Sequence, residues 1–489
     1  MRLAVLASRA GLALPAGADA PVTGFAIDHR KVAPGTVFGA FEGAAVNGES
    51  FIPAAIAAGA VAVVARAEAS VAGAAHIADA APRRAFARLA AQFFTPVPAT
   101  LVAVTGTNGK TSVVEMTRQL WRMAGHRAAS IGTLGVTTSD ESVTTGLTTP
   151  DIVTFLANVS GLAREGVSHL AYEASSHGLA QFRNEGLPVA AGAFTNLSRD
   201  HLDYHATMDD YFAAKMRLFD EVVSDQGAAV IWADDAWSQR AIGHAARRGL
   251  KVMTVGEAGA FIRLVSRAPT QLGQTLELEH DGALCKLELP LIGAYQAANA
   301  LVAAALVLAT GGKRDATFDA MARLQPVRGR LERAAISSAG AAIYVDYAHT
   351  PDALEAAIAA LRPHARGRII VVFGAGGDRD QGKRPEMGRA AAAHTDLAIV
   401  TDDNPRGEDP AAIRAMILAG APGAREIADR RAAIAAAVGE AGPDDIVLIA
   451  GKGHEQGQIV GSGAAMRVLP FDDLAVAREC AAPSARTRP

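Results

Sequence analysis

The stretch LVAVTGTNGKTS at residues 101–112 constrains the fold more than any other part of this chain. Residues 101–104 form a short apolar run of the kind that makes a buried strand. Gly106 and Gly109 allow the backbone to turn sharply and to approach a ligand without a Cβ in the way. Residues 112–125 then show the apolar spacing of a helix. We therefore predict a strand, a tight turn and a helix.

The turn has the chemistry of a phosphate-binding loop. Free N–H groups at the start of a helix, together with the helix dipole, attract anions, and Lys110 adds a full positive charge. The loop is a variant of the G-x-x-x-x-G-K-[ST] motif, because Val104 stands where the first glycine is expected. We expect nucleotide phosphates to bind Gly106, Thr107, Asn108, Gly109, Lys110, Thr111 and Ser112.

Composition narrows the class of protein. A net charge of −3 and a pI near 6.5 give no basic surface for nucleic acid. The two cysteines, Cys285 and Cys480, have no metal-binding spacing and suit a reducing compartment. The sequence has no apolar run of about 18 residues, the length that spans a membrane. Arg9 interrupts the apolar N-terminal stretch, which disfavours a signal peptide, so we expect a cytoplasmic protein.

The length of 489 residues suggests about three domains. We predict three α/β domains, at residues 1–98, 99–326 and 327–489. In the first, residues 25–30 and 36–43 are strand-like, and Pro-Val-Pro at residues 96–98 favours an extended linker.

Polar side chains follow two predicted strands of the central domain. The segment at residues 169–179 indicates a strand that runs into a polar loop, and the segment at residues 192–205 has the same pattern. Parallel α/β sheets bind ligands outside the carboxyl ends of their strands. The two ends carry Glu173, Ser175, Ser176 and His177, and Asp200, His201, Asp203 and His205.

Three strands of the third domain, at residues 368–373, 396–401 and 445–451, also end in charged loops. The first of these loops lacks the third glycine of a dinucleotide-binding fingerprint, since Arg379 stands there, which disfavours a dehydrogenase. The mixed charges suit a zwitterionic small molecule. The charged and polar residues are Arg379, Lys383, Arg384, Asp403, Asn404, Arg406, Lys452, His454 and Glu455.

Thr111, Glu173 and His201 are candidate metal ligands on three strand-end loops. Mg²⁺ takes a few oxygen ligands from protein and the rest from phosphates and water. Lys215 lies on an apolar helix at residues 209–222 and has two interpretations. It is either a surface lysine with a buried stem or a buried lysine of lowered pKa that becomes a carbamate.

Together these motifs resemble those of the Mur ligase family. The resemblance covers nearly the whole chain, and the motifs follow one another in the family order. They are VTGTNGKTS, YEASSHGL, FTNLSRDHLDYH followed by AAK, DYAHTPDAL, GGDRDQGKRP, DNPR and GKGHE.

The resemblance implies a UDP-binding first domain, a central ATPase domain with a mainly parallel sheet, and a Rossmann-like doubly wound third domain. It implies an ATP-dependent ligase of peptidoglycan synthesis that works through an acyl phosphate. The substrates would be a UDP-muramoyl-dipeptide and an amino acid, and the motifs are most similar to those of members that add meso-diaminopimelate. The resemblance further implies ATP and Mg²⁺ as cofactors, with no nucleic-acid partner and no stable membrane insertion. We expect a monomer.

The resemblance also implies residue roles. Lys110, Glu173, His201 and Lys215 would be catalytic, with Thr111, Glu173, His201 and a CO₂-derived carbamate on Lys215 at the metal. Asn299, Arg330 and Asp346 would contact the nucleotide. The UDP-precursor would contact Ile27, His29, Thr148, Thr149, Ser175, Gln181 and Arg183. The amino acid would contact Arg379, Asp403, Asn404, Pro405, Arg406, Gly451 and Glu455.

Arg406 is the predicted determinant of the amino acid. Meso-diaminopimelate differs from L-lysine by one distal carboxylate, which a guanidinium can hold with two parallel hydrogen bonds. Pro405 helps to present Arg406 rigidly, and Arg379 could assist, while Glu455 and Gly451 could hold the distal ammonium.

Alternative functions remain open at this point. A ligase that adds L-lysine would share nearly all the motifs. A ligase like folylpolyglutamate synthase would share the phosphate loop but not DNPR. A non-catalytic nucleotide-binding protein would tolerate the loss of Glu173, His201 or Lys215, and a plain kinase would not need the third domain. The chain departs from common family residues at His29, Leu147, Gln296 and Gly457, and none of these departures removes a catalytic group.

Overall fold

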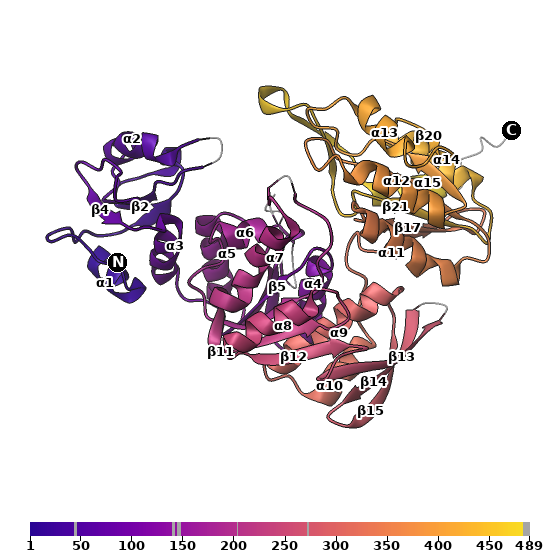
Figure 1. The fold of residues 1–489 in the computed structure, drawn as a ribbon, viewed down its shortest axis with the longest axis horizontal. Coiled ribbons are helices and arrows are strands. Elements are labelled where there is room, and N and C mark those ends of the chain that lie inside the picture. Colours follow the sequence, from indigo (N-terminus) through magenta and orange to yellow (C-terminus); the bar gives the residue numbers. More distant parts are fainter. Residues whose placement is uncertain (44–45, 139–141, 144–147, 203, 271–272, 483–489) are drawn as a thin grey trace.

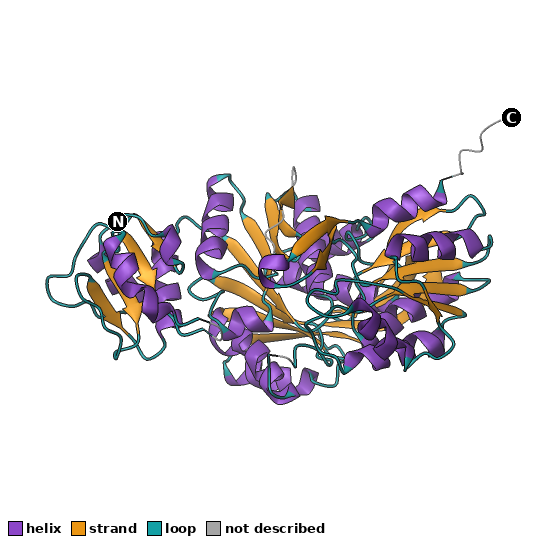
Figure 2. Cartoon of the chain, turned by 90° about the horizontal axis from the view of Figure 1, so that it is seen from above, coloured by secondary structure: helices purple, strands orange, loops and turns teal. Residues whose placement is uncertain are grey.

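The computed structural model describes residues 1–43, 46–138, 142–143, 148–202, 204–270 and 273–482. They form three α/β units, each built on its own sheet and arranged from the indigo N-terminal unit to the orange and yellow C-terminal unit (Figure 1). Seen from above, helices flank the sheets of the central and C-terminal units (Figure 2). This arrangement confirms the predicted fold class.

The first unit has a four-stranded parallel sheet in the order β1-β2-β3-β4. Leu3 and Leu6 of its first helix are fully buried against Phe86 and the sheet. Its elements are α1 (Leu3–Ala10), β1 (Gly24–Ala26), η1 (His29–Lys31), β2 (Thr36–Gly39), η2 (Gly48–Phe51), α2 (Ile52–Ala57), β3 (Ala62–Ala65), β4 (Ala75–Ala78) and α3 (Pro82–Phe93).

The central unit has an eleven-stranded sheet in the order β15-β14-β13-β12-β11-β10-β5-β9-β6-β7-β8. Its middle is parallel, and both edges end in antiparallel strands. Its strands are β5 (Thr100–Thr105), β6 (Ala128–Gly132), β7 (Gly135–Thr137), β8 (Ser142–Val143), β9 (His169–Glu173), β10 (Val189–Phe194), β11 (Val223–Trp232), β12 (Lys251–Gly256), β13 (Ile262–Thr270), β14 (Gly273–His280) and β15 (Ala283–Leu289). Its helices are α4 (Lys110–Met123), α5 (Ile152–Arg164), α6 (Ser176–Ala180), α7 (Met208–Arg217), η3 (Leu218–Val222), α8 (Ser238–Arg247), α9 (Ala294–Ala309) and α10 (Arg314–Met321).

Strand β5 is buried on both faces, as expected for the middle of a parallel sheet. Leu101 and Ala103 join the core on one side, and Val102 and Val104 join the core on the other. The almost wholly apolar helix α9 packs beside α4 on the second side. Strand β5, which leads into this loop, is therefore held between two packed layers.

The C-terminal unit has a six-stranded sheet in the order β16-β17-β21-β18-β19-β20, parallel except for β16. A separate hairpin, β22–β23, follows β21. The elements of the C-terminal unit are β16 (Glu332–Ile336), β17 (Ala342–Asp346), α11 (Pro351–Leu361), η4 (Arg362–His364), β18 (Ile369–Phe373), α12 (Lys383–His394), β19 (Leu397–Val400), α13 (Pro410–Leu418), β20 (Arg425–Glu426), α14 (Arg430–Glu440), β21 (Ile446–Ala450), β22 (Gly457–Val460), η5 (Gly463–Ala465), β23 (Arg467–Pro470) and α15 (Asp473–Ala481).

We propose the domain boundaries after residues 98 and 326. The first lies between α3 and β5, and the second lies between α10 and β16. Among the described residues, no helix combines the length and the apolar character needed to cross a membrane.

Two local expectations were wrong. The strand predicted for residues 25–30 ends at Ala26, because Asp28 accepts a hydrogen bond from the Arg30 N–H and starts the turn η1, which contains His29. The polar loop predicted after β9 begins with the short helix α6. The side chain of Ser175 caps this helix by accepting a hydrogen bond from Gly178 N–H.

Ion pairs connect the three units. Glu185 of the central unit is 5 % exposed and lies 2.7 Å from Arg84 Nε of α3 and 3.5 Å from Arg88 Nε. At the other side, Arg199 of the central unit lies 3.2 Å from Asp380 of the C-terminal unit. The first contact is the more buried, so removal of one of its charges would leave an uncompensated charge between the two units.

The buried position of Glu185 leads to a stability prediction. Glu185→Gln should lower the free energy of unfolding by about 1–3 kcal/mol, because it leaves Arg84, Arg88 and Arg217 with a weaker acceptor. Thermal unfolding followed by circular dichroism would show a lower midpoint. The control is Asp209→Asn, which removes an exposed carboxylate paired with Arg240 and should change the midpoint little. Equal midpoints for the two variants would contradict the assigned role of Glu185.

Candidate active site

The phosphate loop between β5 and α4 needs glycine at two positions. Gly106 has a φ of 145° and Gly109 has a φ of 86°, both in the region that other residues rarely adopt. A Cβ at Gly106 would overlap Thr195 Oγ1, and a Cβ at Gly109 would overlap Asn299 Oδ1. The neighbouring elements therefore approach this loop as closely as a glycine allows.

Two lysine side chains converge on the carbonyl oxygen of Gly106. Lys110 Nζ donates to it at 3.0 Å and to Thr107 O at 2.8 Å, and Lys215 Nζ donates to it at 2.8 Å. Lys215 is 1 % exposed and its ammonium lies 4.2 Å from the centre of the Tyr211 ring. The structure thus rejects the surface-lysine interpretation of Lys215.

The electrostatics of this pair favour bound anions. Burial, followed by the charge of Lys110, lowers the pKa of Lys215 well below that of an ordinary lysine. Burial also lowers the pKa of Lys110, although Glu173 and Asp200 oppose this effect. A negatively charged ligand would therefore stabilise the charged forms of Lys110 and Lys215.

Glu173 ends β9 and faces the start of α4. It is 2 % exposed and accepts hydrogen bonds from Thr111 Oγ1 at 2.9 Å, Thr133 N at 2.7 Å and Thr133 Oγ1 at 3.1 Å. These contacts fix the carboxylate beside the phosphate loop.

His201 lies in the loop after β10, and its φ of 54° is unusual for a residue with a side chain. Its Nε2 is 3.5 Å from Asp200 Oδ2, and its ring centre is 5.0 Å from that of His177. Burial and the nearby charges of Lys215 and Lys110 lower the pKa of His201, against the attraction of Asp200. The imidazole is therefore neutral at pH 7 and has a free electron pair to offer.

The C-terminal unit contributes the other wall of the site. Arg330 Nη2 donates to Thr111 Oγ1 at 3.0 Å. Asp346 ends β17 and accepts hydrogen bonds from Leu331 N at 2.6 Å, from Ala348 N at 2.7 Å and from Tyr295 at 3.3 Å. These bonds hold the first residues of the C-terminal unit beside the phosphate loop.

These groups enclose a cavity of about 480 Å³, which we call the nucleotide cavity. Of the predicted site residues, it brings together Thr107, Asn108, Gly109, Lys110, Thr111, Ser112, Thr148, Glu173, Ser175, His201, Lys215, Asn299, Arg330 and Asp346. Gly106 lies next to it and accepts hydrogen bonds from the two lysines.

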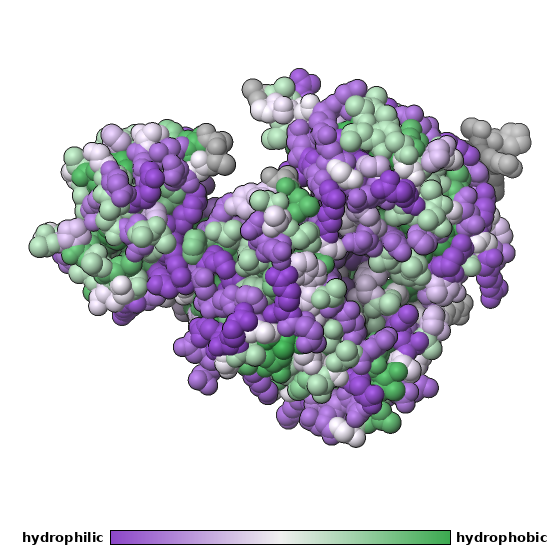
Figure 3. Space-filling view, viewed as in Figure 1, coloured by the Kyte–Doolittle hydropathy of each residue, from purple (hydrophilic) through white to green (hydrophobic). Residues whose placement is uncertain are grey.

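A second cavity of about 1380 Å³, which we call the amino-acid cleft after the ligand that the sequence predicts there, lies between the central and C-terminal units. Arg379, Arg406 and Glu455 line it. Arg406 donates to Gly377 O at 3.0 Å, and among the described residues no carboxylate forms an ion pair with it. In the space-filling view, polar residues cover much of the visible surface around the junction of these two units (Figure 3). The cleft therefore presents an unpaired guanidinium to a ligand.

The two cavities meet. Thr133, Thr148 and Tyr347 line both of them. Ligands bound in the two cavities could therefore contact each other.

The remaining predicted contacts lie around these cavities. Thr149 Oγ1 donates to Ser175 Oγ at 3.0 Å, and Arg183 Nη1 donates to Thr149 O at 2.7 Å. Gln181 Nε2 donates to the hydroxyl of Tyr204 at 3.1 Å. The buried residues Asp403, Asn404, Pro405 and Gly451 lie in the loops behind Arg406 and Glu455.

Ile27 and His29 lie away from both cavities. Ile27 is exposed, and the His29 ring stacks on Phe51 with centres 4.3 Å apart, both in the first unit. Among the noted departures, Gln296 is buried and donates to Arg330 O at 3.0 Å, while Leu147 lies outside the described residues.

The sequence prediction missed several residues of the site. Tyr347 and His349 line the nucleotide cavity and belong to the motif DYAHTPDAL, which offered a signal for them. Thr133 holds Glu173 partly through its backbone N–H, and no motif marks it. Asp200, which the sequence marks only as a polar loop residue, also lines the nucleotide cavity.

Comparison with known protein families agrees with this geometry. Residues 21–94 match the model described as Mur ligase family, catalytic domain. Residues 104–307 match the Mur ligase middle domain, and residues 329–453 match the Mur ligase, glutamate ligase domain.

Curated relatives match along almost the whole chain. The UDP-N-acetylmuramoyl-L-alanyl-D-glutamate--2,6-diaminopimelate ligase of Zymomonas mobilis is 61 % identical over 478 residues, which are 98 % of each chain. The protein of the same name from Bradyrhizobium diazoefficiens is 54 % identical over 463 residues, which are 94 % of each chain.

Solved structures give the same grouping. A structure of a UDP-N-acetylmuramoyl-L-alanyl-D-glutamate--2,6-diaminopimelate ligase has a TM-score of 0.68 and 34 % identity over 94 % of each chain. Folylpolyglutamate synthase of Mycobacterium tuberculosis is 21 % identical over 73 % of this chain and 89 % of its own, with a TM-score of 0.61, and shares the fold alone. With its three matched domains and its closely similar full-length relatives, this chain belongs to the Mur ligase family.

Proposed function

We propose that this protein is an ATP-dependent ligase that adds meso-diaminopimelate to UDP-N-acetylmuramoyl-L-alanyl-D-glutamate, in a step of peptidoglycan synthesis. The observation that carries the proposal is the meeting of a lysine-rich phosphate site with a cleft that presents an unpaired arginine. The names of the full-length relatives support the same reaction.

ATP would bind with its phosphates on the loop at residues 106–112. Lys110 then offsets the charge of the transferring phosphoryl group, and Arg330 approaches from the opposite wall. We assign Asn299 and Asp346 to the nucleotide because both line the same cavity. Phosphoryl transfer needs mainly positioning and charge neutralisation, which these groups supply.

The donor set of the nucleotide cavity suits Mg²⁺. Among the described residues, no three His, Cys, Asp or Glu side chains converge on one point, and Mg²⁺ needs few protein ligands when phosphates and water complete its shell. Thr111, Glu173 and His201 would hold the ion, together with a carbamate on Lys215. When bound, it would neutralise the phosphate oxygens of ATP.

A carbamate on Lys215 fits the surroundings of this amine. Its depressed pKa keeps a fraction of the amine neutral, and a neutral amine can attack CO₂ and lose a proton to give a carbamate. The modification would replace a buried cation beside Lys110 with an anion. It would also turn a hydrogen-bond donor into a metal ligand.

The chemistry would proceed in two steps. An oxygen of the D-glutamyl γ-carboxylate attacks the γ-phosphorus of ATP, and ADP leaves. The neutral amine of the amino acid then attacks the acyl carbon, phosphate leaves, and the nitrogen loses a proton. Thr148, Thr149, Ser175, Gln181 and Arg183 would hold the dipeptide, and Ile27 and His29 would contact the UDP end.

The amino-acid cleft would select its substrate through opposite charges. Arg406, assisted by Arg379, would hold the distal carboxylate of meso-diaminopimelate. Glu455 and the carbonyl of Gly451 would hold the distal ammonium, with Asp403, Asn404 and Pro405 shaping the loop. L-Lysine lacks the distal carboxylate, so it would leave Arg406 desolvated and unpaired.

We also propose that the enzyme acts in the cytoplasm and as a monomer. A cytoplasmic location suits a reaction that consumes ATP, and residues of a single chain line both cavities.

A substrate panel tests the proposed function. The protein is incubated with ATP, Mg²⁺, the UDP-muramoyl-dipeptide and single amino acids, and product mass and phosphate are measured. We expect a product with meso-diaminopimelate and one phosphate released for each product. A parallel reaction offers glutamate and a folate substrate. Faster product formation with L-lysine, or in the folate reaction, would replace the proposed function with one of those activities.

Substitution of Lys215 tests the carbamate. Lys215→Ala should lower kcat by about 10²–10³-fold or more, because a group that stabilises the transition state is lost, and a small carboxylic acid should restore part of it. With ¹³C-bicarbonate, the wild type should show a carbamate carbon signal in NMR that the variant lacks. Lys251→Ala, which removes an exposed lysine, is the control. Wild-type turnover in Lys215→Ala would reject the assignment.

Substitution of Arg406 tests substrate selection. The wild type should strongly prefer meso-diaminopimelate to L-lysine in kcat/KM. Arg406→Ala should lose most of that preference, because loss of one member of a buried charge pair costs roughly 2–5 kcal/mol, or about 30- to several-thousand-fold. The control is Arg425→Ala, which removes an exposed arginine of the same unit. An unchanged preference in Arg406→Ala would show that another group reads the distal carboxylate.

A further inference from the structure

The loops proposed to bind the amino acid follow strands that are not neighbours. Residues 403–406 follow β19 and residues 451–455 follow β21, and β18 lies between these two strands. No ladder of backbone hydrogen bonds therefore joins β19 to β21. The distance between the two loops must be set by other contacts.

One such contact is Lys452, whose side chain is fully buried. Its Nζ lies 2.8 Å from Asn404 Oδ1, 3.4 Å from Asp403 Oδ1 and 3.3 Å from Glu455 Oε2. Lys452 therefore joins the two loops directly. Its three acceptors belong to the proposed amino-acid site, so a change at Lys452 would also disturb that site.

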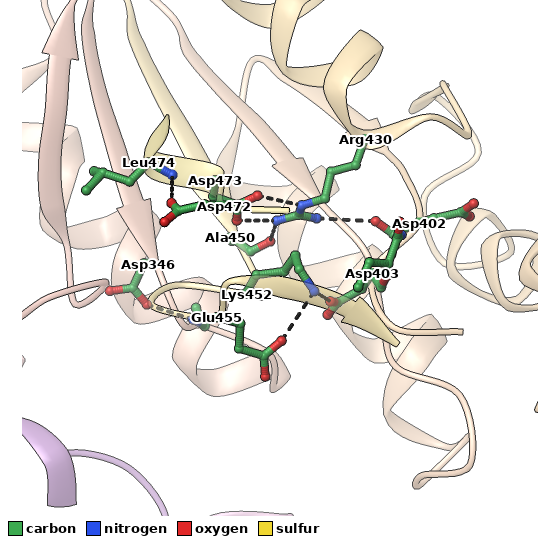
Figure 4. Close-up of polar contacts among 12 residues, drawn as sticks. Asp346, Asp402, Asp403, Arg430, Ala450, Lys452, Glu455, Asp472, Asp473 and Leu474 are labelled. Carbon is green, nitrogen blue, oxygen red and sulfur yellow. Dashed lines mark hydrogen bonds and ion pairs between the residues drawn. The ribbon is translucent and has the colours of Figure 1, made fainter. Parts of the chain in front are cut away.

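A second contact reaches both loops from behind. Arg430 begins α14 and is 2 % exposed. Its Nη2 donates to Ala450 O at 2.9 Å, immediately before the loop that begins at Gly451. Its Nη1 lies 3.5 Å from Asp402 O, immediately before Asp403. Figure 4 shows the guanidinium between these two chain segments.

Asp473 holds Arg430 in this position. Its two carboxylate oxygens accept from Arg430 Nε and Nη2, both at 2.7 Å, and the Asp473 side chain is 0 % exposed (Figure 4). Asp473 is the first residue of α15, and Asp472 caps that helix through Leu474 N at 2.9 Å. The direction of the Asp473 side chain is thus fixed by the packed helix α15.

The energy of a buried ion pair does not by itself explain this arrangement. The cost of removing both charges from water offsets most of their attraction, and apolar side chains of similar volume often give equal stability. What apolar side chains cannot supply is a planar group that donates in several fixed directions at once. Here those directions join α15, the end of β21 and the segment after β19.

We propose that Arg430, oriented by Asp473, is a positioning residue that sets the distance between the loop at residues 403–406 and the loop at residues 451–455. This role rests on the proposed function, because these loops carry the groups assigned to the two ends of meso-diaminopimelate. Neither Arg430 nor Asp473 lines the amino-acid cleft. The pair therefore acts on the substrate through the loops.

Two variants separate positioning from folding. Arg430→Lys keeps a positive charge for Asp473 but cannot donate to three segments in fixed directions. The double variant R430M/D473L replaces the ion pair with apolar side chains, which often preserves stability. The control is Asp445→Asn, which weakens the ion pair with Arg368 at 2.9 Å. Asp445 precedes β21 at the end of the sheet away from the amino-acid loops.

The test measures KM for each of the three substrates, kcat, and the thermal unfolding midpoint of the full-length protein. We expect both Arg430 variants to raise KM for meso-diaminopimelate by about 10- to 100-fold, the size of effect produced by a small misplacement of binding groups. The KM values for ATP and the UDP-precursor should stay near those of the wild type. The preference for meso-diaminopimelate over L-lysine should fall, and Asp445→Asn should leave all of these kinetic values unchanged.

The remaining outcomes overturn the proposal. An unchanged KM for meso-diaminopimelate in both variants would remove the positioning role. An equal rise of all three KM values, or failure of both variants to fold, would show a purely structural role. A wild-type enzyme that does not use meso-diaminopimelate would instead overturn the proposed function, so the two failures are distinguishable.

Discussion

Two lysine side chains share one backbone carbonyl, and the rest of the active site is arranged around them. Lys110 and Lys215 both donate to Gly106 O, one from the start of α4 and one from α7. Burial, and then the repulsion between these two cations, lowers the pKa of Lys215. An anion relieves that repulsion, and a phosphate chain supplies several negative charges. The close approach of the loop after β10 to the phosphate loop depends on Gly106, where a Cβ would overlap Thr195.

The topology brings these groups together from distant parts of the sequence. Strands β10, β5 and β9 are adjacent and parallel, so their carboxyl ends lie along one edge. The phosphate loop follows β5, Glu173 ends β9, and His201 and Lys215 follow β10. In the C-terminal unit, polar loops likewise follow the carboxyl ends of the parallel strands. The strand ends of the two sheets face each other across the connected cavities. Ligands held at the two edges would therefore lie next to each other.

The sequence predicted the parts of the site that local patterns encode. The apolar run, two glycines and Lys110 predicted the phosphate loop, and strand-end position singled out Glu173. Local patterns could not decide whether Lys215 was buried, because that depends on how α7 packs against the phosphate loop. They also missed Thr133, whose backbone N–H binds Glu173, and the Arg430–Asp473 pair, whose members lie 43 residues apart in sequence. These contacts arise from tertiary packing and leave no local pattern.

The central claim is that the terminal phosphoryl group of ATP passes to a carboxylate before the amide bond forms. The most direct measurement uses UDP-muramoyl-dipeptide with ¹⁸O in both oxygens of the D-glutamyl γ-carboxylate, followed by ³¹P NMR of the phosphate released. Because the attacking oxygen leaves with phosphorus when the amine displaces phosphate, the account predicts one ¹⁸O in each phosphate. Phosphate without ¹⁸O, formed together with the amide product, would contradict it.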